Sequence, residues 1–467
     1  MFIGVYMRLV MKFGGTSVGN AERIRAAAEI VRKYRGEETL VVTSAMSGVT
    51  DRLVEISEKV LNGVDEGYIK NFIKYLENKH FKALKEINSS ENTEFFNEIS
   101  DMLSELEKVL IGVSYVGELT PRSRDFILSF GERLVAPLVS AAIEKSGVKS
   151  GWYTGYEAGI VTDQNFGDAT PDFEETAERV NSILYPRLKE IVPVVTGFVA
   201  ADFRGRITTL GRGGSDYTAA ILGSVLEADE IWIWTDVDGI LTADPRLVED
   251  ARIIKEISYI EAMELAYFGA KVLHPKRIEP AMEKGIPVRV KNSFKPDSPG
   301  TVIVNEQEKT NDIVKAISIK GNAVLLTVSG VGMIGVPGVA ARVFKALADK
   351  KVNILMISQG SSEANISMVI DQGDIDNAVI ALKEEFIGAN IVRDVNYNED
   401  VSIVAVVGTG MKGTEGVAAR VFKAISDAGV NVVMIAQGSS EVNISFVVGS
   451  EDAGKAAKAL HREFIET

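Results

Sequence analysis

The chain lacks cysteine and has few histidines, and both shortages exclude particular chemistry. None of the 467 residues is cysteine, so disulfides, iron–sulfur clusters and thiol nucleophiles are excluded. The three histidines, His80, His274 and His461, are scattered along the sequence. Their spacing argues against a histidine-based zinc site.

Positive charge and long apolar runs are also scarce. The net charge of −14 argues against nucleic acid or an anionic membrane as a main partner, although a local basic cleft is compatible with ATP. No apolar run approaches the roughly 20 residues of a membrane helix. The first residues, "MFIGVYMRLVM", lack the apolar core and cleavage site of a secretory signal. We therefore expect a cytoplasmic enzyme without nucleic-acid or membrane partners.

Strand-like and helical patterns alternate up to about residue 300. Continuous apolar runs such as "RLVMKF", "TLVVTSA", "EIWIWTDV" and "PVRVKN" are typical of strands buried on both faces. Helical patterns separate these runs, which predicts a layered α/β domain with a mostly parallel sheet over residues 1–305. Residues from about 51 to 130 are amphipathic with a period near 3.6, and we interpret them as a helical insertion in this domain.

The last third of the chain is an internal repeat. "GVAARVFKA" begins at Gly338 and again at Gly416, and "QGSSE" and "NIS" recur at the same spacing. Each copy predicts a ferredoxin-like βαββαβ module, over residues 306–395 and 396–467, with ligand sites at the seam. "GVGMIG" and "GTGMKG" also fit a dinucleotide fingerprint. Each copy is too short for that fold and lacks the ribose-binding acid, so glycine turns facing a small ligand are the preferred interpretation.

Two glycine-rich segments carry polar residues suited to phosphate or carboxylate. In "KFGGTS", Lys12 precedes Gly14 and Gly15 between a strand and a helix, which is typical of phosphate binding but differs from the P-loop order. In "TLGRGGSDYTAA", Arg212 lies among glycines at a helix start and is suited to clamp a carboxylate. The alternative is an ordinary capped turn, which explains Ser215 or Asp216 but not Gly-Arg-Gly-Gly.

Other segments give weaker signals. The aspartates of "WTDVDGILTADPR" fail the calcium-binding register and are common turn residues, whereas Arg246 is placed to reach ATP phosphates. Lys271 lies two residues after Gly269, but a lysine on a helix is usually only solvated. Ser44, Ser47 and Thr50 follow a strand, and Glu132 lies in "SFGERL". Hydroxyls and one carboxylate suit an α-amino acid, whose ammonium the acid binds while an arginine binds its carboxylate.

"KFGGTSV", "SFGERL" and "TLGRGGSDYTA" together resemble the aspartate kinases of the amino-acid kinase family, over nearly the whole chain. "TDVDGILTADPR" is shared more widely with uridylate, glutamate and acetylglutamate kinases. The paired repeats resemble two ACT modules, and their "QGSSE" and "NIS" segments are most similar to the threonine-sensitive branch, which includes fusions to homoserine dehydrogenase. Because the sequence stops after the second repeat, we expect a monofunctional kinase.

The resemblance implies ATP- and Mg²⁺-dependent phosphorylation of the L-aspartate side chain, the first step of lysine, threonine and methionine biosynthesis. A carboxylate is already ionised at pH 7 and needs no general base. Lys12 would balance the charge of the transferring phosphoryl group, and Asp216 would orient Lys12 or the metal-bound phosphates. Magnesium would be held mostly by phosphates and water, so no protein metal ligands are expected. Arg212 would bind the aspartate α-carboxylate and Glu132 its ammonium, in a pocket shaped by Ser44, Thr50, Phe198, Gly213, Gly214 and Ser215.

The resemblance also implies residues for ATP and for an effector. ATP would be held by Gly14, Gly15, Thr235, Asp236, Leu241, Arg246 and Lys271, with Leu241 standing where many relatives carry tyrosine. An effector amino acid, threonine first and lysine second, would contact Asn353 and Gln359 in one copy and Asn431 and Gln437 in the other. An Asn at a strand start is equally often only a turn residue.

Pairing of the ACT modules implies a homodimer or a dimer of dimers. Two alternatives stay open. One is another acyl-phosphate-forming kinase that acts on glutamate. The other is a catalytically silent ACT sensor, which would need a damaged site, although Lys12, Glu132, Arg212 and Asp216 are all intact.

Overall fold

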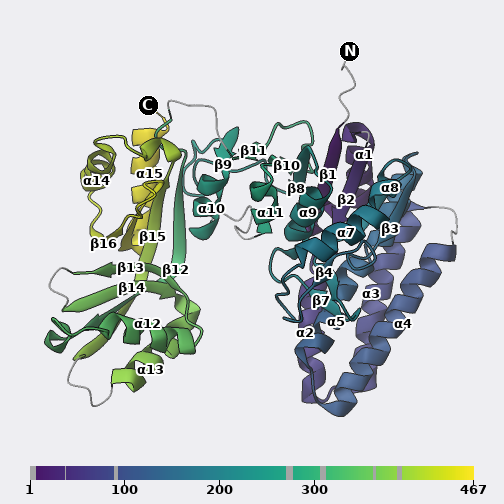
Figure 1. Ribbon diagram of the computed structural model, residues 1–467, viewed down its shortest axis with the longest axis horizontal. Coiled ribbons are helices and arrows are strands. Elements are labelled where there is room, and N and C mark those ends of the chain that lie inside the picture. The colour runs from purple at the N-terminus through teal and green to yellow at the C-terminus, as the bar shows by residue number, and fades with distance from the viewer. Residues whose placement is uncertain are drawn as a thin grey trace. The chain divides into compact units, whose positions relative to one another are not determined.

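The computed structural model describes residues 7–36, 38–88, 93–269, 277–305, 312–360, 364–386 and 392–466. Figure 1 traces these residues as a ribbon coloured along the chain. They divide into two compact units. Unit 1 comprises Met1–Ile240, Lys255–Tyr259 and Val272–Glu306, and unit 2 comprises Leu241–Ile254, Ile260–Lys271 and Gln307–Thr467.

Unit 1 is built on an eight-stranded sheet, which confirms the predicted α/β fold. The strands are parallel except where β10 meets β11. The apolar runs form the central strands because burial on both faces requires apolar side chains at every position. In spatial order the strands are β3 (Ser150–Tyr153), β5 (Val192–Thr196), β2 (Glu38–Thr43), β1 (Arg8–Phe13), β8 (Glu230–Thr235), β10 (Val288–Asn292), β11 (Thr301–Val304) and β9 (Glu256–Ser258).

The helices of unit 1 include the expected insertion. Its long helices α3 (Glu66–Ile87) and α4 (Thr93–Val116) pack against each other (Figure 1). A small second sheet orders β4 (Val161–Thr162), β6 (Val199–Asp202) and β7 (Ile207–Thr209). The other helices are α1 (Ala21–Tyr34), α2 (Val49–Lys59), α5 (Pro121–Arg133), α6 (Ala136–Lys145), α7 (Phe173–Ile183), α8 (Tyr185–Leu188), α9 (Gly214–Val225) and α11 (Glu279–Glu283).

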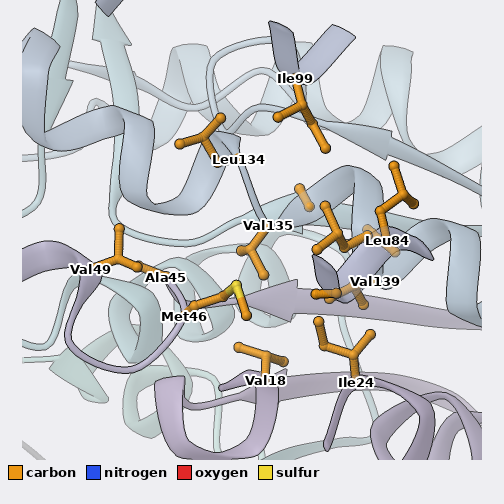
Figure 2. Close-up of a cluster of buried hydrophobic side chains, with 14 of the residues drawn as sticks. Val18, Ile24, Ala45, Met46, Val49, Leu84, Ile99, Leu134, Val135 and Val139 are labelled. Carbon is orange, nitrogen blue, oxygen red and sulfur yellow. The ribbon is translucent and has the colours of Figure 1, made fainter. Parts of the chain in front are cut away.

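One hydrophobic core links the insertion to the loop that follows β2. Leu84 of α3 and Ile99 of α4 belong to the same buried cluster as Ala45, Met46 and Val49 (Figure 2). Apolar packing against the insertion therefore holds this loop in place. Its polar atoms point away from that core.

The stretch from Pro121 to Lys145 corrects one expectation. It is long and apolar enough to cross a membrane by length and composition, although the sequence predicted no such run. Its apolar window is 89% buried inside the protein. The apolar residues of α5 and α6 belong to the buried core of unit 1, whereas the first turn of α5 is exposed.

Unit 2 contains the two repeats, folded alike. The first copy has β12 (Ala316–Ser329), α12 (Val339–Asp349), β13 (Ile354–Gln359), β14 (Asn365–Asp371) and α13 (Ile375–Phe386). The second has β15 (Asp394–Val407), α14 (Val417–Asp427), β16 (Val432–Ala436), β17 (Asn443–Gly449) and α15 (Ala453–Phe464). The strands form one antiparallel sheet in the order β13-β14-β12-β15-β17-β16. Unit 2 also holds most of α10 (Tyr259–Tyr267).

The two modules exchange halves of their long strands. Ile317, near the start of β12, lies in the core of the second copy, whereas Leu326 of the same strand lies in the core of the first. In β15, Val395 packs against the first core and Val404 belongs to the second. Each module is therefore completed by a strand of the other.

Candidate functional site

A cavity of about 390 Å³ lies where β1 and β2 end. Ligands of parallel sheets collect at such carboxyl ends. Of the residues expected to contact aspartate or phosphate, the cavity is lined by Lys12, Gly15, Ser44, Thr50, Glu132, Phe198, Arg212, Gly213, Gly214, Ser215 and Asp216.

Lys12 and Asp216 form an ion pair on the cavity wall. Lys12 Nζ, at the end of β1, lies 2.5 Å from Oδ1 of Asp216 in the first turn of α9. The side chains are 11% and 14% exposed. A carboxylate is favoured in the first turn of a helix, and here it holds the lysine ammonium towards the cavity.

The glycine turn after β1 is used differently from the expectation. Gly14 N donates to the carbonyl of Trp234 at 3.0 Å, because β1 and β8 are neighbours, so this donor is already bonded. Gly14 does not line the cavity. Gly15 does, and a Cβ there would come within 2.9 Å of the Ala45 carbonyl oxygen. Glycine at 15 thus permits a close approach of two backbone segments.

Glu132 is a buried carboxyl with one unpartnered oxygen. It is 4% exposed, and Oε1 accepts a hydrogen bond from Ala45 N at 3.1 Å. No described residue bonds to the buried Oε2. Burial raises the pKa of Glu132 to about 8, although the bond from Ala45 and the charge of Lys12 act the other way. A cation bound next to this carboxyl would lower its pKa and favour the ionised form.

Arg212 lies in a loop built by glycines at left-handed angles. Gly211 and Gly213 have φ of 69° and 72°, and Gly213 caps α9 without any side-chain hydrogen bond. The alternative of an ordinary side-chain-capped turn is therefore wrong. Arg212 is exposed at the cavity, and within the described part of the chain no carboxylate forms an ion pair with it.

Phe198 closes the cavity in a strained backbone conformation. Its φ is 65°, which is uncommon for a residue with a bulky side chain. Its amide donates to Thr218 Oγ1 at 3.0 Å, and its ring lies 2.7 Å from where a Cβ on Gly214 would be. The contact explains why glycine stands at position 214.

The residues expected to hold ATP are divided between the two units. Thr235 and Asp236 follow β8 in unit 1, whereas Leu241 and Arg246 belong to unit 2. The Arg246 guanidinium binds Asp244 with both arms, at 2.6 Å for Nη2 to Oδ2, so its charge is already paired. Lys271 lies outside the described residues.

Sequence reasoning assigned no role to several residues of the cavity. The loop after β2 lines the cavity with more residues than the hydroxyls that the sequence indicated. Gly48, with φ of 76°, is the N-cap of α2 and lies in the cavity wall. Lys79 of the insertion donates to the Ser47 carbonyl at 2.8 Å and fixes this loop. An acid in the first turn of a helix is so common that Asp51 gave no signal. The added residues are Ala45, Met46, Gly48, Asp51 and Gly211, whereas Ser47 was expected among the hydroxyls after the strand.

The structure does not bring together the two effector residues predicted within each copy. Asn353 precedes the six-residue β13, and Gln359 ends it, so about 20 Å separates them at roughly 3.3 Å per residue. Asn431 and Gln437 flank β16 in the same way. All four are exposed. β13 and β16 contact each other.

The glycine turns of the two copies differ in their contacts. In the second copy, Thr409 donates to Glu261 Oε1 from its amide at 2.6 Å and from its hydroxyl at 2.8 Å. Glu261 belongs to α10 and is fully buried. In the first copy, Val331 at the corresponding turn is 78% exposed. In the second copy, the donors of this glycine turn are thus already bonded to the Glu261 carboxylate.

Comparison with known proteins identifies the family and agrees with the fold. A model of the amino acid kinase family matches residues 7–292, and a model of the ACT domain matches residues 326–386 and 404–464. The chain belongs to the aspartokinases of the amino acid kinase family. Aspartokinase 1 of Arabidopsis thaliana is 36% identical over 98% of this chain and 80% of its own length.

Longer relatives and solved structures show the same likeness. The bifunctional aspartokinase/homoserine dehydrogenase 2 of Arabidopsis thaliana is 36% identical over 97% of this chain, which spans about half the length of that relative. The structure of E. coli aspartokinase III with aspartate and ADP has a TM-score of 0.82 at 33% identity, covering 98% of this chain and 99% of that one. Clostridium acetobutylicum aspartate kinase gives 0.82 at 28% identity, over 98% of this chain and all of that one.

Proposed function

We propose that this chain transfers the γ-phosphoryl group of ATP to the side-chain carboxylate of L-aspartate. The observation that carries the proposal is the cavity that combines an exposed arginine, a buried carboxyl with a free oxygen and a lysine held by an aspartate. Arg212 binds the α-carboxylate and Glu132 the ammonium. The side-chain carboxylate is then directed at Lys12. The likeness to a structure that holds aspartate and ADP supports this assignment.

The chemistry needs positioning and charge rather than a base. The substrate carboxylate is ionised at neutral pH and attacks the γ-phosphorus directly. Lys12 stabilises the negative charge of the transferring group, and Asp216 keeps the ammonium in place. The phosphates enter as a complex with Mg²⁺, which is held mostly by phosphate oxygens and water. Within the described residues no cluster of three or more His, Asp or Glu side chains is arranged to hold a metal.

Trapping of the acyl phosphate with hydroxylamine tests the reaction. Wild type with Mg-ATP and L-aspartate should give the hydroxamate. Lys12→Met should lower kcat by about 100-fold or more, as losing a charged transition-state contact does. Lys33→Met is the matched control, because Lys33 also lies 2.5 Å from an aspartate, but in an exposed pair. Product with glutamate but not with aspartate would contradict the proposal.

We also propose that an end-product amino acid regulates this enzyme. The phosphorylation of aspartate would be the first step of a pathway that leads to lysine, threonine and methionine. Threonine is the first candidate on the similarity of the repeats, and lysine the second. The E. coli protein of the matched structure binds lysine and aspartate. The first copy is the favoured site in this chain, because Glu261 already bonds the turn of the second.

Calorimetry with threonine and then lysine tests effector choice and stoichiometry together. One threonine bound per chain, with inhibition of hydroxamate formation, is the expected result. Binding of lysine alone would reverse the order of the candidates. Two equivalent sites per chain would contradict the role of Glu261.

We also propose a homodimer, or a dimer of dimers, formed through the ACT modules. The support is apolar surface on the outer strands of their sheet. Ile357 of β13 and Val433 and Ile435 of β16 are 47%, 46% and 48% exposed. Exposed apolar residues on edge strands favour association. Light scattering that finds a monomer at micromolar concentration would contradict this.

A further inference from the structure

Arg277 is a buried arginine next to the substrate loop that the mechanism above does not use. It is 8% exposed and makes three contacts within unit 1. Nε donates to the Arg212 carbonyl at 2.9 Å, and Nη2 donates to Asp168 Oδ1 at 2.6 Å. The guanidinium lies 5.0 Å from the ring centroid of Tyr217 in α9. It therefore binds the backbone of the residue proposed to hold the α-carboxylate.

The Arg277–Asp168 pair lies directly against the turn before Arg212. A Cβ on Gly211 would lie 2.3 Å from Asp168 Oδ1 and 2.9 Å from Arg277 Nη2. With φ of 69° at Gly211, only glycine allows the turn to pass this close to the pair. The path of the chain into Arg212 is thus defined from outside the cavity.

The neighbouring backbone is fixed by a second buried acid. Asp125 of α5 is 1% exposed and accepts hydrogen bonds from Gly167 N and Thr209 N, each at 2.9 Å. Asp168 follows Gly167, and the loop of Arg212 follows Thr209. The two segments that the Arg277 guanidinium joins therefore start from one common anchor.

The Arg277–Asp168 ion pair contributes more to positioning the chain than to the stability of the fold. The Asp168 side chain is 69% exposed, and ion pairs with one partner in water contribute little to folding. The rigid guanidinium fork binds a carbonyl and a carboxylate at once, which a lysine ammonium reproduces poorly.

We propose that Arg277, supported by Asp168, is a positioning residue that sets where Arg212 presents its guanidinium to the substrate α-carboxylate. The inference rests on the proposed role of Arg212. Arg277 does not touch the substrate. Its loss should therefore act on recognition of the α-carboxylate and spare recognition of the rest of aspartate.

Two substrates separate this role from a general structural one. L-Aspartate and its α-amide differ only at the α-carboxyl group, which is a charged carboxylate in one and a neutral carboxamide in the other, so the ratio of their kcat/KM values reports the contact of Arg212. If the α-amide turns over too slowly, its competitive inhibition constant replaces its kcat/KM. The variants are Arg277→Met, Arg277→Lys, Asp168→Asn and Arg212→Met. Arg289→Met is the control, because Arg289 binds Glu230 with both arms where β8 and β10 begin, at the opposite end of the strands.

Arg212→Met and Arg277→Met should each lower the aspartate-to-amide ratio about tenfold or more, and the double variant should lower it no further. Arg277→Lys and Asp168→Asn should give intermediate ratios, and Arg289→Met should keep that of wild type. If Arg277→Met is poorly folded by its thermal unfolding midpoint, these two conservative variants decide the question.

Two results would overturn the inference in different ways. An equal loss for both substrates in the Arg277 and Asp168 variants, with the ratio collapsed in Arg212→Met, would make Arg277 purely structural and leave the proposed function intact. A wild-type ratio in Arg212→Met would remove the proposed role of Arg212, and the inference with it.

Discussion

At the scale of single residues, the charge state of Glu132 controls substrate binding under the proposed function. Its carboxyl is buried and accepts a hydrogen bond from Ala45 N in the loop after β2. Burial raises its pKa to about 8, so the empty cavity holds a neutral acid at pH 7. The aspartate ammonium needs the ionised form. Binding should therefore release a proton.

The pH dependence of aspartate binding follows from this shift. Below pH 8 the ionised fraction of Glu132 falls tenfold per pH unit, so kcat/KM for aspartate should rise with pH at a slope near one and level off above 8. The KM for ATP should change little over the same range. Steady-state kinetics between pH 6 and 9 measure both. A flat aspartate profile would contradict the role of Glu132.

The same carboxyl should make the folded state less stable at high pH. Its pKa rises from 4.5 in the unfolded chain to about 8 in the native state, so between these values the native state binds more protons. Its contribution to the free energy of unfolding is thus lost as the pH rises from 4.5 to 8. Glu132→Gln should remove this loss and be more stable than wild type above pH 8, by on the order of a few kcal/mol.

Urea unfolding of both proteins at pH 5 and pH 8.5 measures this effect. Wild type should lose more stability between the two conditions than Glu132→Gln does. Equal losses would mean that the carboxyl is not desolvated as the cavity indicates.

At the scale of elements, helix α9 is placed by glycines rather than by side-chain caps. Gly213 supplies the left-handed turn, and Gly214 lets Phe198 and Leu210 approach the helix start. The geometry brings Ser215 and Asp216 to the cavity. The sequence indicated a functional loop before α9, but it could not show which residues each glycine contacts.

Gly214→Ala should therefore cost both stability and activity. The added Cβ would lie 2.7 Å from the Phe198 ring and 3.1 Å from its Cα, which forces the loop to move, at a cost of about 1–3 kcal/mol. Gly112→Ala on α4 is the control, because nothing lies within 4 Å of that Cβ. Alanine is favoured over glycine inside a helix, so this control should gain up to about 1 kcal/mol. Thermal unfolding and hydroxamate formation test the pair.

At the scale of the whole molecule, the kinase region and the repeats are not separate along the sequence. Ala243 and Val248 belong to the core of the second ACT module. Thr242 Oγ1 lies 2.9 Å from His461 Nε2, on the last helix. A segment that resembles a nucleotide-binding signature is thus folded into unit 2.

A chain truncated after residue 305 should therefore be less stable and less active than the full chain, although the sequence predicts a catalytic domain that ends at that point. The cut exposes Ala243, Val248 and the buried face of α10 to water. We expect a lower unfolding midpoint and aggregation, with activity well below that of the full chain. A stable truncated protein with full kcat would show that Leu241–Ile254 folds without unit 2.

Local patterns account for much of the fold and of the cavity at the ends of β1 and β2. Buried parallel strands need continuous apolar runs, and the runs around β1, β2 and β8 were recognisable for that reason. Lys12 and Arg212 were found because glycine-rich turns at strand ends rarely surround a charged residue without a ligand. Arg277 and Asp168 gave no signal, since each is an ordinary charged residue until the fold brings them together.

The sequence by itself determined the α/β class, the two repeats and the residues that meet at the ends of β1 and β2. These depend on periodicity and turn chemistry, which act over a few residues. Only the tertiary structure decided that Gly14 is already bonded, that β12 and β15 exchange halves, and that Glu261 fills one of two similar turns. Such contacts join residues far apart in the chain. They are selected by packing and by the cost of leaving buried polar groups unpaired, and no local pattern records that choice.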